Sequence, residues 1–464
     1  MLPRLFESDH CVIGAAGELI ANGTDLGRLA RERETPFFLI SEQILVDNYK
    51  RLMGSFAGID DVRAFYSVKT NYETEVLRTW RRLGTGAEVS GELDFHVARL
   101  AGFDPRDMVF DGPCKTDAEL ERAVLDGVRL INMESLDEIA RLDAIGRRLD
   151  RRVRVGVRLD PMSRRPYYDK MITTYKQKFG FPLATAPQAF AAIRECRNLQ
   201  LVGLHAHIGS QILAPVLYVE ALTAMFQVAA DLRRDGFELS EINVGGGFPA
   251  QSMRNLRLSR RMLGAKLLER FGRLEKRTPS IEEFGQAIAT TYRECAGKHG
   301  FRPALAIEPG RCLVNNAGML VGRVRFLKGD WLFTDISINE VPENLFFTEW
   351  RVFFPGKLHS PIVGKKNVSG PTLSTYDTLF FQKEVPDLAP GDPIVIFDTG
   401  RYSIPRANQF TRPRSGVFFQ EAAGGIRMIR RRETVEDVVR AQIWGTPEPF
   451  REPAVPHVAA VRGR

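Results

Sequence analysis

Short apolar runs alternate with charged, helix-forming stretches over the middle of the chain, and this alternation limits the fold more than any other feature. The stretch Glu73–Leu83 carries apolar residues at helical spacing, and Thr116–Leu125 opens with a Thr-x-x-Glu capping box. Strand-like runs separated by helices predict an α/β fold with a parallel sheet. Eight such runs spread over about 245 residues predict a (β/α)8 barrel. They cover residues 64–69, 86–90, 108–112, 129–133, 152–160, 201–208, 241–247 and 304–310.

The pattern changes near residue 315, where Gly/Pro turns begin to separate apolar or alternating segments such as 321–327 and 393–398. This is typical of antiparallel β structure, so a second domain is expected there. The first ~35 residues show no helix of note, so we expect them to lend a strand to that β domain. The predicted division is an N-terminal segment over 1–36, the barrel over 37–315, the β domain over 316–450 and a tail over 451–464.

Composition agrees with a two-domain globular chain. The length of 464 residues exceeds one ordinary hydrophobic core, and 44% hydrophobic with 26% charged residues is an ordinary balance. No stretch reaches the roughly 18 to 20 apolar residues that span a bilayer, and the N-terminus lacks the apolar segment of a secretory signal. The five scattered cysteines form no CxxC pair, which indicates reduced thiols and no zinc site. We therefore expect a cytoplasmic protein with no membrane partner and no metal.

The formal net charge of +8 raises the question of nucleic-acid binding. The basic residues are spread along the chain, and the densest runs, at 147–152 and 430–432, are short. They have no interleaved aromatic residues, and no nucleic-acid motif is present. We expect no nucleic-acid partner. The basic surface is either simply solvated or faces an anionic substrate or an acidic partner protein.

Residues suited to chemistry stand at the ends of four predicted barrel strands. The first strand ends in Lys69, the sixth in His207-Ile-Gly-Ser-Gln, the seventh in Gly245-Gly-Gly-Phe-Pro and the eighth in Glu308-Pro-Gly-Arg. Barrels of this kind carry functional groups at the C-terminal strand ends, with a phosphate site in the last two loops. Singly, each feature has an ordinary explanation, such as a lysine that reaches water or a glycine turn. Together, a lysine, a phosphate cradle, a flat histidine and a carboxylate are what pyridoxal phosphate requires.

The chain closely resembles the fold-type III pyridoxal-phosphate decarboxylases, the diaminopimelate/ornithine decarboxylase family. The resemblance implies pyridoxal 5'-phosphate as cofactor, and a (β/α)8 barrel followed by a C-terminal antiparallel β-barrel domain, as in alanine racemase. It also implies a homodimer with the active site at the subunit interface. The motifs that carry it are Tyr66-Ser-Val-Lys-Thr-Asn, Lys178-Phe-Gly, His205-Ala-His-Ile-Gly-Ser-Gln, Gly245-Gly-Gly-Phe-Pro, Glu308-Pro-Gly-Arg, Gly370-Pro-Thr-Leu-Ser-Thr-Tyr-Asp, Asp398-Thr-Gly-Arg-Tyr and Ile429-Arg-Arg-Arg-Glu-Thr.

The resemblance also assigns roles to individual residues. Lys69 would form the internal Schiff base with the cofactor aldehyde, and His207 would stack on the pyridine face. Glu308 would pair with the pyridinium nitrogen and raise its pKa, which makes the ring a full electron sink and favours decarboxylation over racemisation. The other expected cofactor contacts, mostly to the phosphate, are Ser210, Gly246, Gly247, Gly310, Arg311 and Tyr402.

Three departures from the family pattern concern the substrate. Leu373 stands where the family has a cysteine from the partner subunit that helps to reprotonate the carbanion. Ser374 replaces a glutamate that holds the distal amine of diaminopimelate. The stretch Pro342-Glu-Asn-Leu-Phe replaces an Arg-Pro-x-Leu-Tyr segment that contacts the distal carboxylate. These changes predict decarboxylation of an amino acid or amino-acid conjugate other than meso-diaminopimelate, as in siderophore or antibiotic pathways, with a carrier-bound substrate left open.

Several points stay open at this level. The proton donor is Lys69, a water or a hydroxyl such as Tyr376, and Asp377 is expected to join Leu373 in the segment that enters the partner's site. The stretch around Glu88 is one residue shorter than the family's usual spacing.

Two alternatives accompany the decarboxylase reading. One is other carbanion chemistry, racemisation or decarboxylation-dependent oxidation, which the loss of the family cysteine motivates. The other is a noncatalytic regulator, against which the intact Lys69, Glu308 and Arg311 weigh.

Overall fold

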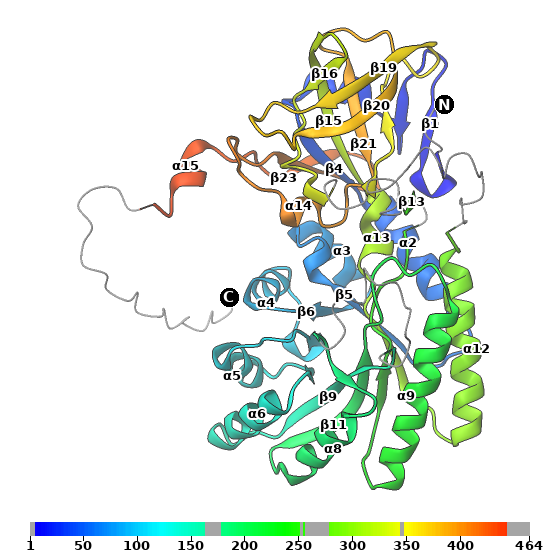
Figure 1. Ribbon diagram of the computed structural model, residues 1–464, viewed down its shortest axis with the longest axis vertical. Coiled ribbons are helices and arrows are strands. Elements are labelled where there is room, and N and C mark those ends of the chain that lie inside the picture. Colours follow the sequence, from blue (N-terminus) through cyan, green and yellow to red (C-terminus); the bar gives the residue numbers. More distant parts are fainter. Residues whose placement is uncertain (1–4, 163–177, 251–253, 256–277, 344–347, 443–464) are drawn as a thin grey trace.

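The computed structural model describes residues 5–162, 178–250, 254–255, 278–343 and 348–442. Figure 1 shows two regions, a barrel surrounded by helices and a β domain that stands over one end of it. The predicted tail over 451–464 lies outside the described residues. None of the described helices is both long enough and apolar enough to cross a bilayer.

Eight parallel strands close into a barrel, because the last strand in the sequence pairs with the first. Each of the eight predicted runs overlaps one of these strands, so the predicted barrel is confirmed, although β5 and β11 each begin two residues earlier than predicted. The strands, in order around the barrel, are β5 (Val62–Ser67), β6 (Gly86–Val89), β7 (Met108–Phe110), β8 (Leu130–Met133), β9 (Val153–Asp160), β11 (Leu199–Ala206), β12 (Glu241–Asn243) and β14 (Ala304–Ile307).

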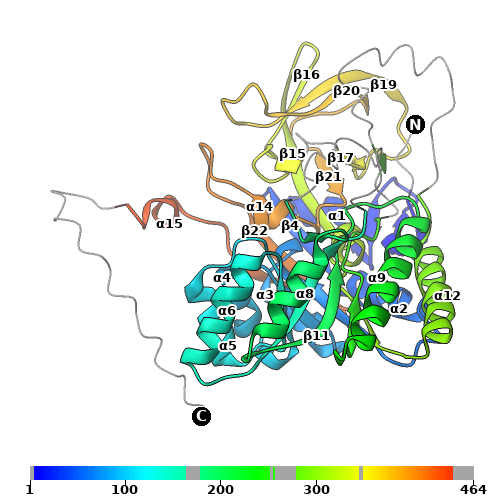
Figure 2. The same cartoon turned by 60° about the horizontal axis from the view of Figure 1, so that its bottom comes forward.

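Amphipathic helices cover the outside of the barrel (Figures 1 and 2). The predicted capping box at Thr116 is present: its hydroxyl accepts from the Glu119 N–H and its own N–H donates to the Glu119 carboxylate. A second box at Ser280 begins α12, which is 19 residues long. The helices are α2 (Glu42–Gly54), α3 (Thr74–Arg82), α4 (Glu92–Leu100), α5 (Asp117–Asp126), α6 (Leu136–Arg148), α8 (Ala186–Glu195), α9 (Val216–Arg234) and α12 (Ile281–His299).

The β domain is a mostly antiparallel sheet, in which β16 pairs with β19 and β4 with β22 in parallel. Along the sheet the order is β20 (Thr378–Pro386), β19 (Ile362–Ser369), β16 (Trp331–Thr334), β15 (Gly318–Lys328), β4 (Phe37–Ser41), β22 (Gly416–Gln420) and β23 (Ile426–Arg430). Off this path, β21 (Pro393–Phe397) pairs with β15 and with β18 (Val352–Phe353). Short helices α14 (Ser403–Arg406) and α15 (Val435–Val439) follow its strands, and β13 (Arg254–Asn255) pairs with β17 (Thr348–Glu349) outside this sheet.

Strand β4 is the strand that the N-terminal part of the chain contributes to the β domain. It begins one residue after the predicted boundary at residue 36. All five of its residues are buried between β15 and β22, so it is a central strand of that sheet. The preceding residues form a separate sheet of β1 (Cys11–Ile13), β2 (Leu19–Ala21) and β3 (Thr24–Asp25). They also form a helix, α1 (Leu26–Glu32), where we expected none of note.

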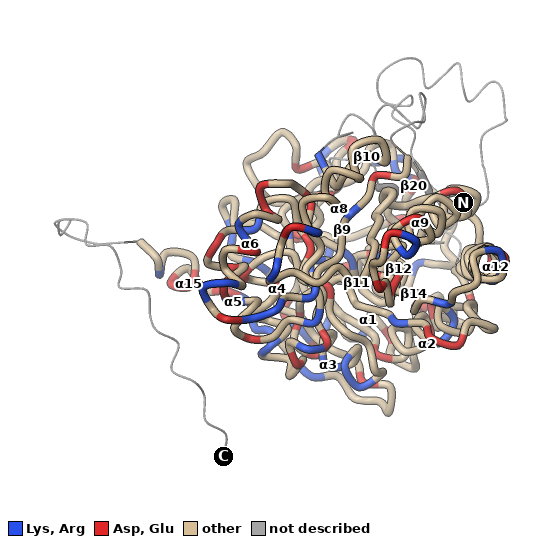
Figure 3. The backbone as a smooth tube through the Cα atoms, turned by 90° about the horizontal axis from the view of Figure 1, so that it is seen from below, with Lys and Arg blue, Asp and Glu red and all other residues tan. Residues whose placement is uncertain are grey.

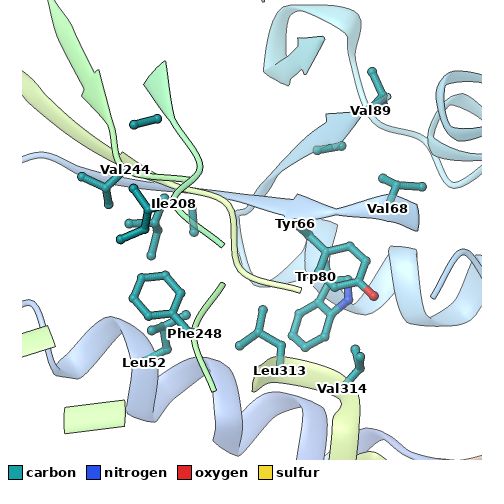
Figure 4. Close-up of a cluster of buried hydrophobic side chains, with 14 of the residues drawn as sticks. Leu52, Tyr66, Val68, Trp80, Val89, Ile208, Val244, Phe248, Leu313 and Val314 are labelled. Atoms are coloured by element: carbon teal, nitrogen blue, oxygen red, sulfur yellow. The ribbon is translucent and has the colours of Figure 1, made fainter. Parts of the chain in front are cut away.

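A buried apolar cluster supports the strand that leads to Lys69 (Figure 4). Tyr66 and Trp80 lie with ring centroids 5.1 Å apart, and Val68 is fully buried in the same cluster. Phe65, one position before Tyr66, belongs instead to the apolar layer inside the barrel. Lys69 follows two residues after the end of β5, in the short 3-10 turn Val68–Thr70.

Charged residues of both signs are interspersed over the helices seen from below (Figure 3). Arg148 pairs with Glu121 at 2.8 Å and Arg141 with Asp117 at 2.6 Å, across α5 and α6. The basic residues of this face are therefore largely balanced by neighbouring carboxylates, as expected for a solvated surface.

Candidate active site

Lys69 projects into the mouth of the barrel, where its ammonium contacts a buried carboxylate. It follows β5 in a short turn, and its Nζ lies 2.5 Å from both carboxylate oxygens of Glu88, in β6. Glu88 is buried, whereas 45% of the Lys69 side chain is exposed. Burial tends to lower the pKa of Lys69, but the charge of Glu88 outweighs it, so this pKa lies above its ordinary value.

Three buried titratable side chains meet beneath Lys69, at the ends of β7, β11 and β14. His205 Nε2 lies 3.3 Å from Glu308 Oε2 and 3.7 Å from Asp111 Oδ2. Burial, together with the charge of Asp111, raises the pKa of Glu308 to about 7. Burial also acts to raise the pKa of Asp111, but the positive charges of His205 and Arg158 lower it to about 2.

These three side chains offer ligand atoms within 4.8 Å of one another, which is close enough for a metal ion. However, Asn243 Nδ2 donates to Glu308 Oε1 at 2.7 Å, and Asn132 Nδ2 donates to Asp111 Oδ1 at 2.7 Å. Asparagine side chains thus already donate hydrogen bonds to the carboxylates of Glu308 and Asp111. The cluster is therefore organised as a hydrogen-bond network rather than as a metal site.

Glycines build a close-packed cradle in the loops after β12 and β14. A Cβ atom on Gly246 would lie 2.3 Å from a backbone carbonyl oxygen, and one on Gly247 would lie 2.2 Å from another. Gly247 also has φ of +95°, which disfavours any other residue. A Cβ on Gly310 would lie 2.2 Å from the Thr70 hydroxyl oxygen. Only glycine fits these positions, so the loops keep the close approach of backbone to backbone that a larger residue would prevent.

Arg311 and Tyr402 lie beside this cradle. Arg311 Nη2 donates to Ser210 Oγ at 3.1 Å, and its guanidinium carbon lies 5.1 Å from the centre of the Tyr402 ring. The Tyr402 backbone N–H donates to the carbonyl oxygen of Thr70 at 2.7 Å. This bond ties the β domain to the turn that carries Lys69.

His207 stands at the mouth with its ring exposed. The Gly246 N–H donates to His207 Nδ1 at 3.2 Å, so Nδ1 is unprotonated and the proton of the neutral ring is on Nε2. Loss of hydration inside the mouth and the positive charges of Arg158 and Lys69 lower the pKa of His207 to about 3. The ring is therefore flat, neutral and held in one orientation.

The structure thus brings together every expected cofactor residue, but not the segment expected to contact the substrate. That segment, the loop of residues 370–377, joins β19 to β20 in the β domain. Leu373 is 96% exposed and Tyr376 is 71% exposed, whereas Ser374 is partly buried. In the part of the chain that the structure describes, no hydrogen bond joins this loop to the Lys69 site.

Asp377 belongs to the same loop but is buried, with 1% of its surface exposed. Its carboxylate accepts from the Ile338 N–H at 2.7 Å, and from the Thr372 N–H and hydroxyl at 2.8 and 2.6 Å. Asp377 therefore stabilises the conformation of its own loop. The exposed tip of the loop is formed by Leu373 and Tyr376.

The family model described as "Pyridoxal-dependent decarboxylase, pyridoxal binding domain" matches residues 44–315, more than half of the chain. The protein belongs to the pyridoxal-dependent decarboxylases. Diaminopimelate decarboxylase of Aquifex aeolicus is 26% identical over 434 residues, which are 92% of this chain and 96% of that one. Diaminopimelate decarboxylase of Methanothermobacter thermautotrophicus is 28% identical over 92% of this chain and 96% of that one.

Solved structures agree with this assignment. The crystal structure of diaminopimelate decarboxylase from Methanocaldococcus jannaschii superposes with a TM-score of 0.83 at 25% identity, over 94% of this chain and 98% of that one. The Helicobacter pylori enzyme, complexed with L-lysine, gives 0.75 at 26% identity, over 89% and 98%. The predicted fold, enzyme class and cofactor are confirmed. Identities this low do not establish the substrate.

The side chains of this decarboxylase fit pyridoxal phosphate. The glycine loops pack so closely on neighbouring protein atoms that no Cβ fits, and beside them Arg311 with Ser210 supplies charge-assisted donors for a phosphate. Lys69 offers an amino group, and Glu308 offers a buried carboxyl acceptor beneath the same mouth. The neutral face of His207 completes a flat slot suited to an aromatic ring.

Part of the segment that departs from the family pattern lies outside the described residues, namely Asn344, Leu345 and Phe346. Its described residue Glu343 is buried and pairs with Arg401 and, at 3.3 Å, with Arg406. The stretch Pro342-Glu-Asn-Leu-Phe stands where the resemblance implies an Arg-Pro-x-Leu-Tyr motif. The carboxylate of Glu343 in this stretch is already paired with two arginines of the same chain.

Two functional groups escaped the sequence analysis. Asp111 and Arg158 end β7 and β9 and act on the pKa values of the site, and Arg158 is itself held by Glu134 at 2.6 Å. A third, Glu88, drew attention only through its spacing. All stand near C-terminal strand ends, so the rule that found Lys69 could have found them.

Proposed function

We propose that this enzyme removes the α-carboxylate of an amino acid or amino-acid conjugate other than meso-diaminopimelate. The proposed substrate class rests on one observation: the family residues that would contact the distal end of diaminopimelate are replaced in this chain. Leu373 and Ser374 present no proton donor of the cysteine kind and no carboxylate for a distal amine, and Glu343 is committed to Arg401. A secondary-metabolic pathway and a cytoplasmic location are parts of this proposal.

In the proposed mechanism, Lys69 holds the cofactor, and Glu88 sets the charge of its amino group. The phosphate would be held by Gly246, Gly247, Gly310, Ser210, Arg311 and Tyr402. The His207 ring would cover one face of the pyridine ring. Pyridoxal phosphate, when bound, supplies an electron sink for the electron pair left by departing CO2. The buried carboxyl group of Glu308 would pair with the ring nitrogen.

Lys69 is also the proposed proton donor that replaces the family's cysteine. Its raised pKa keeps a proton on Nζ at neutral pH, and the Glu88 carboxylate at 2.5 Å can accept or return that proton. Leu373 has no such proton, and Tyr376 is the alternative donor from a partner subunit.

The test is the stoichiometry of products. A panel of α-amino acids is incubated with the holoenzyme, and CO2, ammonia and hydrogen peroxide are measured together. One CO2 per substrate, without ammonia or peroxide, supports decarboxylation. Peroxide and ammonia in step with CO2 would support decarboxylation-dependent oxidation, the second candidate that Leu373 motivates. If no substrate gives CO2, ammonia or peroxide, the optical rotation of the amino acid is followed: its loss supports racemisation, and an unchanged rotation favours a noncatalytic regulator.

A homodimer with a shared site is part of the proposal. It is supported by the outward position of Leu373 and Tyr376, large apolar side chains on a loop remote from the Lys69 site of the same chain. Mixed dimers of Lys69→Ala and Tyr376→Ala chains should recover activity that neither variant has alone. Asp377→Ala is unsuitable here, because that residue shapes its own loop. No recovery in the mixed dimer would exclude a contribution of Tyr376 to the partner's site.

A free small-molecule substrate, rather than a carrier-bound one, is part of this proposal. Decarboxylation of a free amino acid with a rate independent of added carrier protein would support this choice.

A further inference from the structure

Two arginines contact the Tyr402 ring beside the phosphate cradle, and a third precedes Tyr402 in the chain. Arg311 and Arg406 each place the guanidinium carbon 5.1 Å from the ring centre. Arg401 precedes Tyr402 in the chain and is fully buried. Glu343 supplies a carboxylate to Arg401 and Arg406.

The negative charge of Glu343 mainly compensates the positive charge of the buried Arg401. The Arg401 side chain is 0% exposed, its Nη1 donates to Glu343 Oε2, and its Nε donates to Asn315 Oδ1 at 2.6 Å. Its guanidinium also lies 5.1 Å from the Trp350 ring centre. A buried guanidinium is strongly destabilising without a counter-charge. Glu343 is therefore fixed to Arg401 and is not free to neutralise a second arginine fully.

Arg406 is placed differently. Its side chain is 59% exposed, and its contact with Glu343 is a single hydrogen bond of 3.3 Å from Nη1. Among the residues that the structure describes, its Nε and Nη2 have no hydrogen-bond partner. Arg406 ends α14, and the N-cap of this helix is Tyr402, whose N–H donates to the carbonyl oxygen of Thr70, next to Lys69. Arg406 is thus held at the rim of the mouth with two donors turned to solvent.

We propose that Arg406 binds an anionic group at the distal end of the substrate. This inference rests on the proposed decarboxylation and narrows its substrate class. Ser374 offers no carboxylate for a distal amine, whereas Arg406 offers guanidinium donors that no described residue engages, and the two observations together favour an acidic distal end. Guanidinium binds carboxylate and phosphate oxygens through paired N–H groups, which suits either anion. The substrate is an α-amino acid with an ω-carboxylate, or an ω-phosphate or phosphonate of similar length.

The test compares α-amino acids of equal chain length that end in a carboxylate, a phosphonate, an amide or an amine. Holoenzyme should release CO2 from the anionic members with kcat/KM about 10-fold or more above the amide and amine. Arg406→Ala should lower kcat/KM for the anionic members by about 10- to 100-fold, mainly through KM. It should leave the amide unchanged. Arg412→Ala, another exposed arginine of the same domain, is the matched control and should change none of them.

The ratio of carboxylate to phosphonate turnover identifies which anion the site prefers. An equal loss for anionic and amide substrates, or a wild-type preference for the amine, would overturn the inference. Calorimetric binding of glutarate, adipate and pimelate to the holoenzyme decides the matter without turnover. Tighter binding by wild type than by Arg406→Ala supports the inference, and equal affinity overturns it. Arg406-dependent binding with no CO2 from any amino acid would instead contradict the proposed function alone.

Discussion

Lys69 lies with its ammonium 2.5 Å from both carboxylate oxygens of Glu88, a residue of the neighbouring barrel strand with almost no exposed surface. This pair explains how a lysine can follow directly on a buried strand. Its charge is compensated from the barrel side, while nearly half of its side chain remains accessible from the mouth. The same carboxylate keeps the amino group protonated to high pH.

Glu88→Gln should lower the pKa of Lys69, because it removes the charge that raises this pKa. The unprotonated amine is the form that attacks an aldehyde. The rate at which cofactor-free protein acquires the visible absorbance band of attached pyridoxal phosphate should therefore rise at lower pH in the variant than in wild type. A pH profile of this rate measures the shift. Superimposable profiles for the two proteins would show that Glu88 does not control the amino group.

Glu308 should make the stability of the cofactor-free protein depend on pH. Its pKa is raised from 4.5 to about 7, so the folded state holds this proton more tightly than the unfolded chain. The resulting stabilisation is full below about pH 4.5 and is lost as the pH rises through about 7. In Glu308→Gln the free energy of unfolding, measured in urea, should fall less steeply across this window. An unchanged slope would contradict the assignment.

Gly247→Ala should weaken both folding and cofactor binding. A Cβ there would lie 2.2 Å from a carbonyl oxygen, at φ of +95°. Gly236 is the matched control, since its φ is +87° but nothing lies within 4 Å of the added atom. Gly236→Ala should cost only the backbone strain, about 1 kcal/mol. Gly247→Ala should cost at least about 1 kcal/mol more and raise the Kd for pyridoxal phosphate. Equal costs would mean that the cradle is not tightly packed.

Asp377→Ala should lower the free energy of unfolding by about 2 to 4 kcal/mol, because it leaves the buried Ile338 N–H without its acceptor. Tyr376→Ala, one residue away and 71% exposed, should change the stability of the isolated chain by about 0.5 kcal/mol or less. Thermal unfolding of dilute protein gives both values. A stable Asp377→Ala protein would show that the loop does not depend on these bonds.

The barrel could be predicted from the sequence because its signal is local and repeated. Each strand is a short apolar run, and the helix at Thr116 carries its cap in adjacent residues. The site at the strand ends followed from the same regularity. Lys69, His207, Glu308 and Arg311 were found because each stands in a dense motif directly after a strand.

The rest depends on pairings that no local pattern contains. The strand β4 is assigned to the β domain only by its contacts with β15 and β22, far away in the chain. The burial of Asp377 depends on Ile338, and the partnership of Glu343 with Arg401 spans two separate segments. Such long-range contacts became evident only in the folded chain.

The central claim is that Lys69 carries pyridoxal phosphate in a catalytic site. The most direct measurement is the visible absorbance spectrum of the purified protein with added pyridoxal phosphate, compared with that of Lys69→Ala. The account predicts the band of an attached cofactor in wild type and its loss in the variant. A wild-type protein that shows no band after cofactor is added would contradict the account.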